Sequence, residues 1–245
     1  MQEKRSWAIG VAVVIIKPTL MATTDREWID GDRNLPADGG CVIALNHLSH
    51  LDPITSALLV YDHGRIPRYL AKSGLFNNKA LGFFLRAAGQ IPVYRETAGA
   101  GGAYSAAVAA VRRGECVIIY PEATITRDPD LWPMRGKSGA ARIALETGCP
   151  VVPIGQWGVQ DILPPYTKKP HLFPRKKIIA RVGPPVDLAD LAAKQPRTTE
   201  VVAEATDRIM SAITHELEQI RGAAAPPERY DMRVHGDRFK KRKSA

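Results

Sequence analysis

Short apolar runs alternate with segments of helical periodicity along most of the chain. The clearest run, Cys41–Leu45, follows Gly39 and Gly40 and contains Val and Ile, which is typical of a buried strand. Further strands are expected at Pro67–Lys72, Gln90–Tyr94, Glu115–Tyr120, Pro150–Gly155 and Lys176–Val182. Helices are expected from Asp52 onward and at Asn77–Ala88, Ala103–Arg113, Gly136–Thr147 and Thr198–Gly222. This order predicts an α/β fold with a mostly parallel central sheet flanked by helices.

The N-terminal segment departs from this alternation. Trp7–Ile16 holds ten residues without a charge, about half the length of a helix that spans the hydrocarbon core of a bilayer. Lys17 and Pro18 are expected to end it. We therefore expect residues 1–22 to form an interfacial helix that anchors the chain to one leaflet. A buried N-terminal helix and a signal peptide are the alternatives.

Composition and charge narrow the classes of partner. The 245 residues, 45% of them hydrophobic, suffice for a substantial core, and we expect one domain at residues 23–222. The net charge of +9 favours phosphate substrates, anionic membranes or nucleic acid. Aromatic residues make up only 7% and no zinc-finger spacing occurs, which ranks nucleic acid last. Residues 223–245 carry seven Lys or Arg and three Asp or Glu, and are predicted to form a flexible basic tail.

The loop after the first strand holds the best candidates for chemistry. His47 comes two residues after the strand, and Asp52 opens the next predicted helix together with Pro53. A loop of this length can fold back and bring the carboxylate against the imidazole ring. Neutral imidazole is well suited to accept a proton near neutral pH, and a carboxylate on its far nitrogen fixes the tautomer.

Each of these residues also has a plain structural interpretation. Asp52 can be a helix N-cap, and His47 and His50 can be ordinary loop residues. A metal site is not expected, because no further His or Cys lies close in the sequence to complete a ligand set. No Ser or Cys is partnered with the pair either, so the nucleophile would be a substrate hydroxyl.

The segment Asn46–Asp52 resembles the NHxxxxD signature of the glycerolipid acyltransferases, the family of the lysophosphatidate acyltransferases. Further blocks follow in the family's order, and together they cover roughly Asp38–Gly155. Gly89–Arg95 resembles the second block, Gly-x-Ile-x-Val/Ile-x-Arg, which implies that Arg95 contacts the substrate phosphate. A surface arginine paired with a neighbouring acid is the alternative.

The segment Tyr120–Thr124 resembles the third block, Phe-Pro-Glu-Gly-Thr-Arg. The resemblance implies that Glu122 and Thr124 serve the acceptor. Glu122 would orient the acceptor or brace the loop by accepting backbone N–H bonds. Two positions depart from the block, because Ala123 replaces the family's glycine and Ile125 replaces its arginine.

Three cations are candidates to replace that arginine, namely Arg127, Arg135 and Lys137. The last two lie at the start of a predicted helix, whose exposed N–H groups also favour an anion. The fourth block is a Val-Pro-Ile strand end that contains Pro153 and Ile154, which the family assigns to the acyl-donor side. A plain core strand is equally consistent with these two residues.

The resemblance implies an O-acyltransferase that moves a fatty acyl group from an acyl-CoA or acyl-carrier-protein thioester to the hydroxyl of 1-acylglycerol-3-phosphate, making phosphatidate in phospholipid biosynthesis. Glycerol-3-phosphate itself or a glycolipid hydroxyl is the alternative acceptor. A basic membrane- or nucleic-acid-binding module is the non-enzyme alternative. No metal or cofactor is implied beyond the acyl thioester. Cys41, Cys116 and Cys149 adjoin apolar strands, and their odd number favours a reducing compartment. We therefore expect a monotopic or peripheral protein at the cytoplasmic face of the cell membrane.

Overall fold

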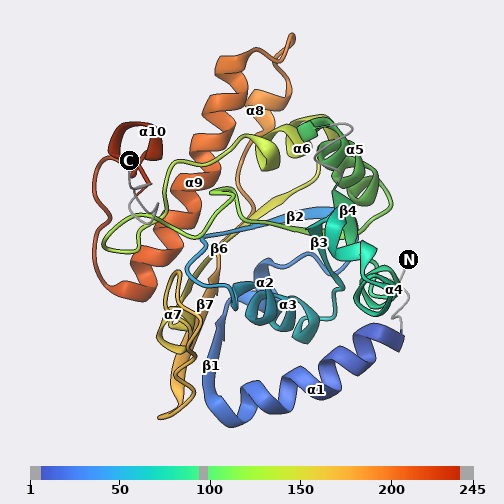
Figure 1. The fold of residues 1–245 in the computed structure, drawn as a ribbon. Coiled ribbons are helices and arrows are strands. Elements are labelled where there is room, and N and C mark those ends of the chain that lie inside the picture. Colours follow the sequence, from blue (N-terminus) through green and yellow to red (C-terminus); the bar gives the residue numbers. More distant parts are fainter. Residues whose placement is uncertain (1–6, 94–98, 238–245) are drawn as a thin grey trace, which may run out of the picture.

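The computed structural model describes residues 7–93 and 99–237, so Arg95 lies outside the described residues. A seven-stranded sheet in the order β1-β7-β6-β2-β5-β3-β4 forms its centre (Figure 1). All neighbours pair in parallel except β6 and β7. The strands are β1 Thr24–Ile29, β2 Cys41–Leu45, β3 Pro67–Lys72, β4 Ile91–Val93, β5 Cys116–Ile119, β6 Val151–Trp157 and β7 Lys176–Val182. The predicted α/β fold with a mostly parallel sheet is confirmed.

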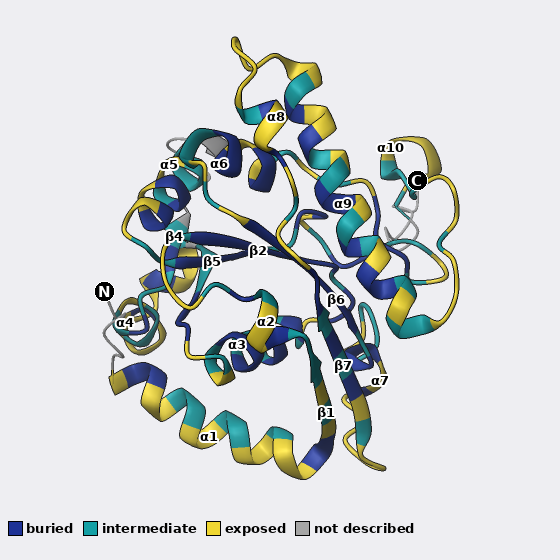
Figure 2. Ribbon diagram, turned by 180° about the vertical axis from the view of Figure 1, so that it is seen from behind, coloured by how far each residue is buried: buried dark blue, intermediate teal, exposed yellow. Residues whose placement is uncertain are grey.

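Helices cover both faces of this sheet (Figures 1 and 2). The α-helices are α1 Trp7–Thr23, α2 Gly31–Asn34, α3 Asp52–Asp62, α4 Lys79–Ala87, α5 Gly99–Arg112, α6 Gly139–Thr147, α7 Val159–Ile162, α8 Ala189–Ala192, α9 Thr199–Arg221 and α10 Met232–His235. A 3-10 helix, η1 Ser73–Asn77, precedes α4. The predicted helices are present with boundaries shifted by a few residues. The short helices α2, α7, α8 and α10 were not predicted.

Strand β2 lies at the centre because both of its faces are apolar. Val42 and Ala44 pack into a cluster with residues of α5, α6 and α9, whereas Ile43 and Leu45 pack on the opposite face with residues of α3. All five residues of β2 are buried. A strand buried on both faces reads as a continuous apolar run, which explains why the sequence located it without error.

The long helix α9 packs along β6 through an apolar stripe. Val202, Ile209, Ile213 and Leu217 of that stripe are buried against the sheet. The close crossing depends on Gly155 in β6, because a Cβ atom there would lie 2.5 Å from the backbone nitrogen of Leu217. The helix thereby supports the central strands from behind the site described below.

Helix α1 differs from the expectation, because it continues through Lys17 and Pro18 to Thr23. The Lys17 ammonium pairs with Asp62 of α3 at 2.7 Å, so its charge does not end the helix. The hydroxyls of Thr19 and Thr23 bond to carbonyls four residues earlier in the same helix. Among the described residues, the structure contains no helix whose length and apolar character would let it cross a bilayer.

Two further segments were read incompletely from the sequence. Strand β1 was missed because its residues are mostly polar, as suits a strand at the edge of the sheet. The described part of the predicted flexible tail, residues 223–237, folds back beside α9 and includes α10 (Figure 1). Ion pairs hold it there, and the pattern of apolar residues along the chain gives no sign of them.

Candidate active site

The candidate site lies at the carboxyl ends of three neighbouring parallel strands, β5, β2 and β6. Asn46 and His47 follow β2, and Tyr120 follows β5. Asn46 exchanges three hydrogen bonds with Gln156 near the end of β6, at 2.8 to 3.0 Å. These bonds fix the start of the β2–α3 loop (residues 46–51). Ligand sites in open α/β sheets form at this edge, so the position suits chemistry.

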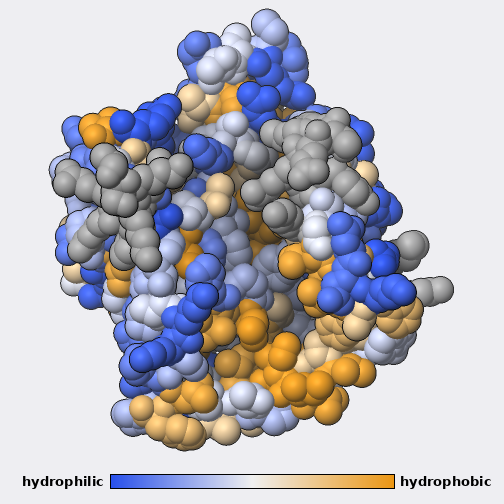
Figure 3. Space-filling model, in the orientation of Figure 1, coloured by the Kyte–Doolittle hydropathy of each residue, from blue (hydrophilic) through white to orange (hydrophobic). Residues whose placement is uncertain are grey.

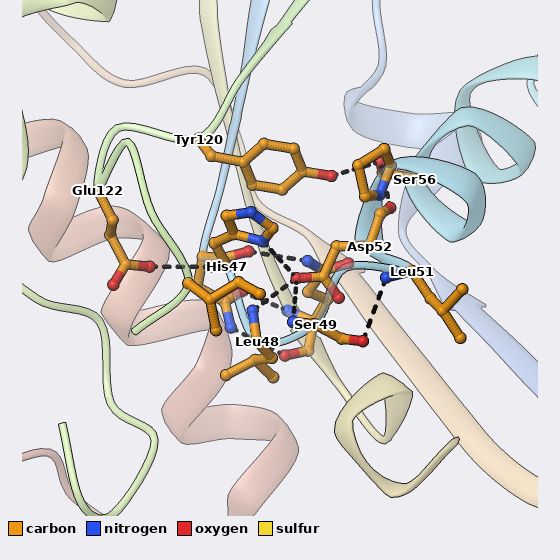
Figure 4. Close-up of polar contacts among 12 residues, drawn as sticks. His47, Leu48, Ser49, Leu51, Asp52, Ser56, Tyr120 and Glu122 are labelled. Carbon is orange, nitrogen blue, oxygen red and sulfur yellow. Dashed lines mark hydrogen bonds and ion pairs between the residues drawn. The ribbon is translucent and has the colours of Figure 1, made fainter. Parts of the chain in front are cut away.

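His47 and Asp52 meet within one short loop, as predicted from their spacing. The Nδ1 atom of His47 lies 2.8 Å from Oδ2 of Asp52, and the side chain of His47 remains 16% exposed (Figure 4). The prediction that Asp52 is the N-cap is wrong by one position, because Leu51 takes that place. The Asp52 carboxylate instead turns back along the chain and accepts hydrogen bonds from the N–H groups of Leu48 and Ser49.

These contacts give Asp52 an unusual environment. Its side chain is fully buried, and burial raises the pKa of its carboxyl group above the ordinary value. The His47 ring and the two backbone N–H groups oppose this shift by stabilising the carboxylate. All three contacts converge on Oδ2, whereas Oδ1 accepts no hydrogen bond from the described residues. The carboxylate is therefore held in one orientation, with its charge directed at the imidazole.

Tyr120 packs on one face of the His47 ring, a contact that the sequence did not reveal. The two rings stack with centroids 4.4 Å apart and planes inclined by 24°. The Tyr120 hydroxyl bonds to Ser56 of α3 at 2.8 Å, and Ser56 also contacts the hydroxyl of Tyr69 and the carbonyl of Asp52. Burial holds the pKa values of both tyrosines well above the ordinary value. The signal in the sequence was a tyrosine where the family block has phenylalanine.

Glu122 braces two loops, which was one of the two roles expected for it. Its Oε1 accepts the backbone N–H of His47 at 2.9 Å (Figure 4), and its Oε2 accepts that of Met134 at 2.9 Å. The N–H of Thr126 in turn donates to the carbonyl of His47 at 2.8 Å. Burial raises the pKa of Glu122 to about 8, against the stabilising effect of the two N–H donors. Glu122 therefore contacts the backbone of His47 rather than presenting a side chain to a ligand.

The remaining predicted residues lie along the β5–α6 loop (residues 120–138). Ala123 adopts the left-handed backbone conformation, with φ 59°, that the family's glycine adopts without strain. Ile125 is buried, so the position of the family's arginine contributes to the core here. The hydroxyl of Thr124 lies beside that of Tyr166.

The three candidate cations differ in exposure. The Arg127 side chain is mostly buried, with its guanidinium 3.8 Å above the Tyr166 ring, whereas Arg135 and Lys137 are exposed. Both arginines form ion pairs with residues of the C-terminal segment. The structure therefore places all three cations on the loop that passes His47. The most buried of them, Arg127, comes two residues after Ile125, the position of the family's arginine.

Pro153 and Ile154 lie inside the sheet. They pair in register with Ala44 and Leu45 of β2, and Ile154 is fully buried in the apolar cluster on the α3 face. This placement suits a core strand that ends beside Asn46. The assignment of both residues to the acyl-donor side stays a prediction from the resemblance.

The arrangement can remove a proton from a hydroxyl group. Asp52 accepts a hydrogen bond from the Nδ1–H group of His47, which leaves Nε2, on the far side of the ring from Asp52, with a lone pair (Figure 4). The cations of the β5–α6 loop suit an anionic ligand. Among the described residues, the structure contains no cluster of His, Cys, Asp and Glu that could hold a metal ion.

Comparisons with known proteins agree with this chemistry. The sequence model of the acyltransferase family matches residues 28–157. The chain is 32% identical over 191 residues to a 1-acyl-sn-glycerol-3-phosphate acyltransferase of Bacillus subtilis (strain 168), covering 76% of this chain and 87% of the relative. It is 34% identical over 138 residues to the chloroplastic 1-acyl-sn-glycerol-3-phosphate acyltransferase BAT2 of Brassica napus, covering 56% and 38%. The fold is similar to the crystal structure of the 1-acyl-sn-glycerophosphate (LPA) acyltransferase, PlsC, from Thermotoga maritima, with a TM-score of 0.60, 17% identity, and coverage of 89% and 84%.

Proposed function

Because the chain belongs to the acyltransferase family, we propose that it transfers a fatty acyl group from a thioester of coenzyme A or acyl carrier protein to the free hydroxyl of 1-acylglycerol-3-phosphate. The observation that carries this proposal is the 2.8 Å contact between His47 and Asp52 in a partly exposed loop. The names of the relatives supply the acceptor. The product is phosphatidate, which makes the reaction a step of phospholipid synthesis.

The reaction proceeds by direct transfer between the two substrates. Nε2 of His47 takes the proton of the acceptor hydroxyl as its oxygen attacks the thioester carbonyl, and Asp52 stabilises the imidazolium that forms. The tetrahedral intermediate then breaks its carbon–sulfur bond. The thiolate takes the proton back from His47, so ester and free thiol leave and the imidazole returns to its neutral state. Asp52 acts through His47 and is a positioning residue.

The acceptor phosphate binds to cations of the β5–α6 loop. Arg127 and Arg135 offer guanidinium groups, whose forked N–H donors match phosphate oxygens, and Lys137 adds charge at the start of α6. Arg95 is assigned to the same task from the resemblance of its block. Glu122 keeps the loop against His47, so it fixes the spacing between the phosphate-binding cations and the general base.

Lysolipids reside in membranes, so the enzyme must reach the leaflet, and α1 is the element that provides this contact. Trp7 packs against Phe83 and Phe84 of α4 and is itself 58% exposed. Figure 3 shows hydrophobic residues gathered along this side of the molecule. The exposed large apolar residues of α1 are Trp7, Val11, Val14, Ile15 and Met21. Such a face suits insertion to headgroup depth.

Vesicle binding tests the role of α1. Val14 and Ile15 are 73% and 64% exposed, so replacing both by glutamate should leave folding intact. We expect the variant to lose sedimentation with vesicles of anionic phospholipid while its Tm stays within about 2 °C of the wild-type value. Equal sedimentation of variant and wild type would assign membrane contact to another surface.

Release of free thiol tests the reaction itself. Wild-type protein mixed with an acyl-CoA and lysophosphatidate should release coenzyme A, and His47→Ala should reduce the rate by several powers of ten. Parallel reactions with glycerol-3-phosphate and with a neutral lysolipid identify the acceptor. Undiminished activity of the His47→Ala variant contradicts the mechanism. Absence of release with every acceptor, together with binding to anionic vesicles or DNA, favours the non-enzyme alternative.

A further inference from the structure

The C-terminal strap, defined as residues 225–237, returns from the end of α9 and lies beside the β5–α6 loop (Figure 1). Arg229 anchors it to α9 by pairing with Asp207 and by donating to Ser211. The carbonyl of Tyr230 accepts the backbone N–H of Arg135 at 3.0 Å. The strap therefore touches the loop that carries the candidate phosphate-binding cations.

Two carboxylates of the strap meet two of those cations. Asp237 approaches Arg127 with its two oxygens, at 2.9 Å from Nε and 3.3 Å from Nη2. Asp231 lies 3.0 Å from Nη1 of Arg135. Both arginines proposed to hold the acceptor phosphate are therefore already paired with acids of the same short segment.

The geometry at Arg127 is that of an anion complex. Two carboxylate oxygens facing two nitrogens of one guanidinium imitate the way a phosphate binds arginine. The Arg127 side chain is only 12% exposed and its flat face lies on the Tyr166 ring, so it has little freedom to accept a second anion elsewhere. A phosphate that binds Arg127 from the same side must displace Asp237.

The strap is attached in a way that permits displacement. Helix α10 has no fully buried residue, and Val234 within it is 77% exposed, so little apolar packing fixes this turn. A cavity of about 1200 Å³ lies between the strap, the β5–α6 loop and α9. Its wall includes Glu122, Met134, Lys137 and strap residues. The Arg135 side chain is 63% exposed, so its ion pair with Asp231 contributes little stability and is screened by salt.

We propose that the strap is an internal competitor for the acceptor's phosphate: Asp237 and Asp231 occupy Arg127 and Arg135 in the free protein and are displaced by a phosphate dianion. The proposal rests on the phosphate-binding role assigned to these arginines under the proposed function. It makes the two acids determinants of specificity. A neutral lysolipid offers nothing to replace the ion pairs it would break, whereas a phosphate dianion carries more charge than the carboxylate it displaces.

Steady-state kinetics of strap variants provide the test. In full-length Asp237→Asn protein, we expect the KM for lysophosphatidate and the inhibition constant of inorganic phosphate to fall about three- to tenfold, with kcat within about twofold of wild type. Asp231→Asn, at the more exposed pair, should act in the same direction with a smaller change. Glu228→Gln is the matched control, because it removes the same charge from an exposed position of the strap.

An unchanged or increased KM in both Asp variants overturns the proposal, since Asp237 would then be neutral or would orient Arg127 for the substrate. Hydrogen exchange in the wild-type protein adds a readout that does not require turnover: amides 229–236 should exchange faster when lysophosphatidate is added, and unaltered exchange also counts against displacement. Failure of the proposed function is recognised separately, because the wild-type protein would then release no thiol from acyl-CoA.

Discussion

Replacing Glu122 by glutamine changes the side chain that holds the β5–α6 loop to His47. The carboxyl group accepts one backbone N–H with each oxygen, from His47 and from Met134. An amide has one accepting oxygen, so one of these buried N–H groups loses its partner and faces the amide N–H₂. A buried donor left unpaired costs about 1–3 kcal/mol, so Glu122→Gln should be less stable than wild type by about this amount under mildly acidic conditions.

The same substitution should change how stability depends on pH. Burial raises the pKa of Glu122 to about 8 in the folded protein, whereas the ordinary value is 4.5. Between these values the folded state holds a proton that the unfolded chain has released, so wild-type stability falls as the pH rises. Each pH unit in this range lowers the free energy of unfolding of the wild-type protein by about 1.4 kcal/mol, which gives roughly 4 kcal/mol between about pH 5 and pH 8. Glutamine does not titrate, so the variant lacks this contribution.

Urea unfolding followed by tryptophan fluorescence at about pH 5.5, 7 and 8.5 measures both effects. We expect wild type to be more stable than Glu122→Gln at the lowest pH. As the pH rises, the difference between their free energies of unfolding should shrink and then change sign. Glu228→Gln, which removes a charge from an exposed side chain, should follow the wild-type pH dependence. Parallel pH profiles for wild type and Glu122→Gln would refute the inference that Glu122 is folded into the protein in its protonated form.

Three further substitutions test the site. Asp52→Asn should lower kcat by several powers of ten but less than His47→Ala, because the imidazole loses the acceptor of its Nδ1 proton; loss of activity equal to that of His47→Ala would contradict a purely positioning role. Tyr120→Leu should lower kcat about tenfold with little change in KM, because it removes the ring stacked on His47. The kcat of Tyr120→Phe, which keeps the ring, should stay within about threefold of wild type. Equal kcat values for the two variants would show that the stack has no influence. Ala123→Gly should raise the free energy of unfolding by about 0.5–1 kcal/mol, because glycine adopts φ 59° without strain; a lower Tm in a thermal scan would oppose this reasoning.

The sequence located the reactive pair because its signal is local. His47 and Asp52 are five positions apart, between a strand of apolar residues and a helix start, so chain geometry nearly determines their contact. Strand β2 was equally accessible, since its five apolar residues are buried on both faces. Patterns confined to a few neighbouring residues carried most of the correct predictions.

The features that escaped prediction depend on contacts between distant segments. Tyr120 meets His47 only because β5 pairs in parallel with β2, and register is absent from a periodicity pattern. The charge of Lys17 predicts an end of α1 there, but its ion-pair partner, Asp62, is 45 positions away in the sequence. The strap likewise folds through ion pairs between residues about 100 positions apart in the chain. Single-sequence reasoning has no access to such pairings.

The contact between His47 and Asp52 is closed within six consecutive residues, and the N–H groups that orient the acid belong to the same stretch. The proton-handling unit is therefore self-contained, whereas everything proposed to recognise the acceptor sits on separate parts of the chain. Exchange or lengthening of those outer parts can redirect the enzyme to a different alcohol without rebuilding its reactive centre. Because the proton-transfer residues and the acceptor-binding residues lie on separate segments, an α/β protein of this size can change its substrate while its chemistry stays the same.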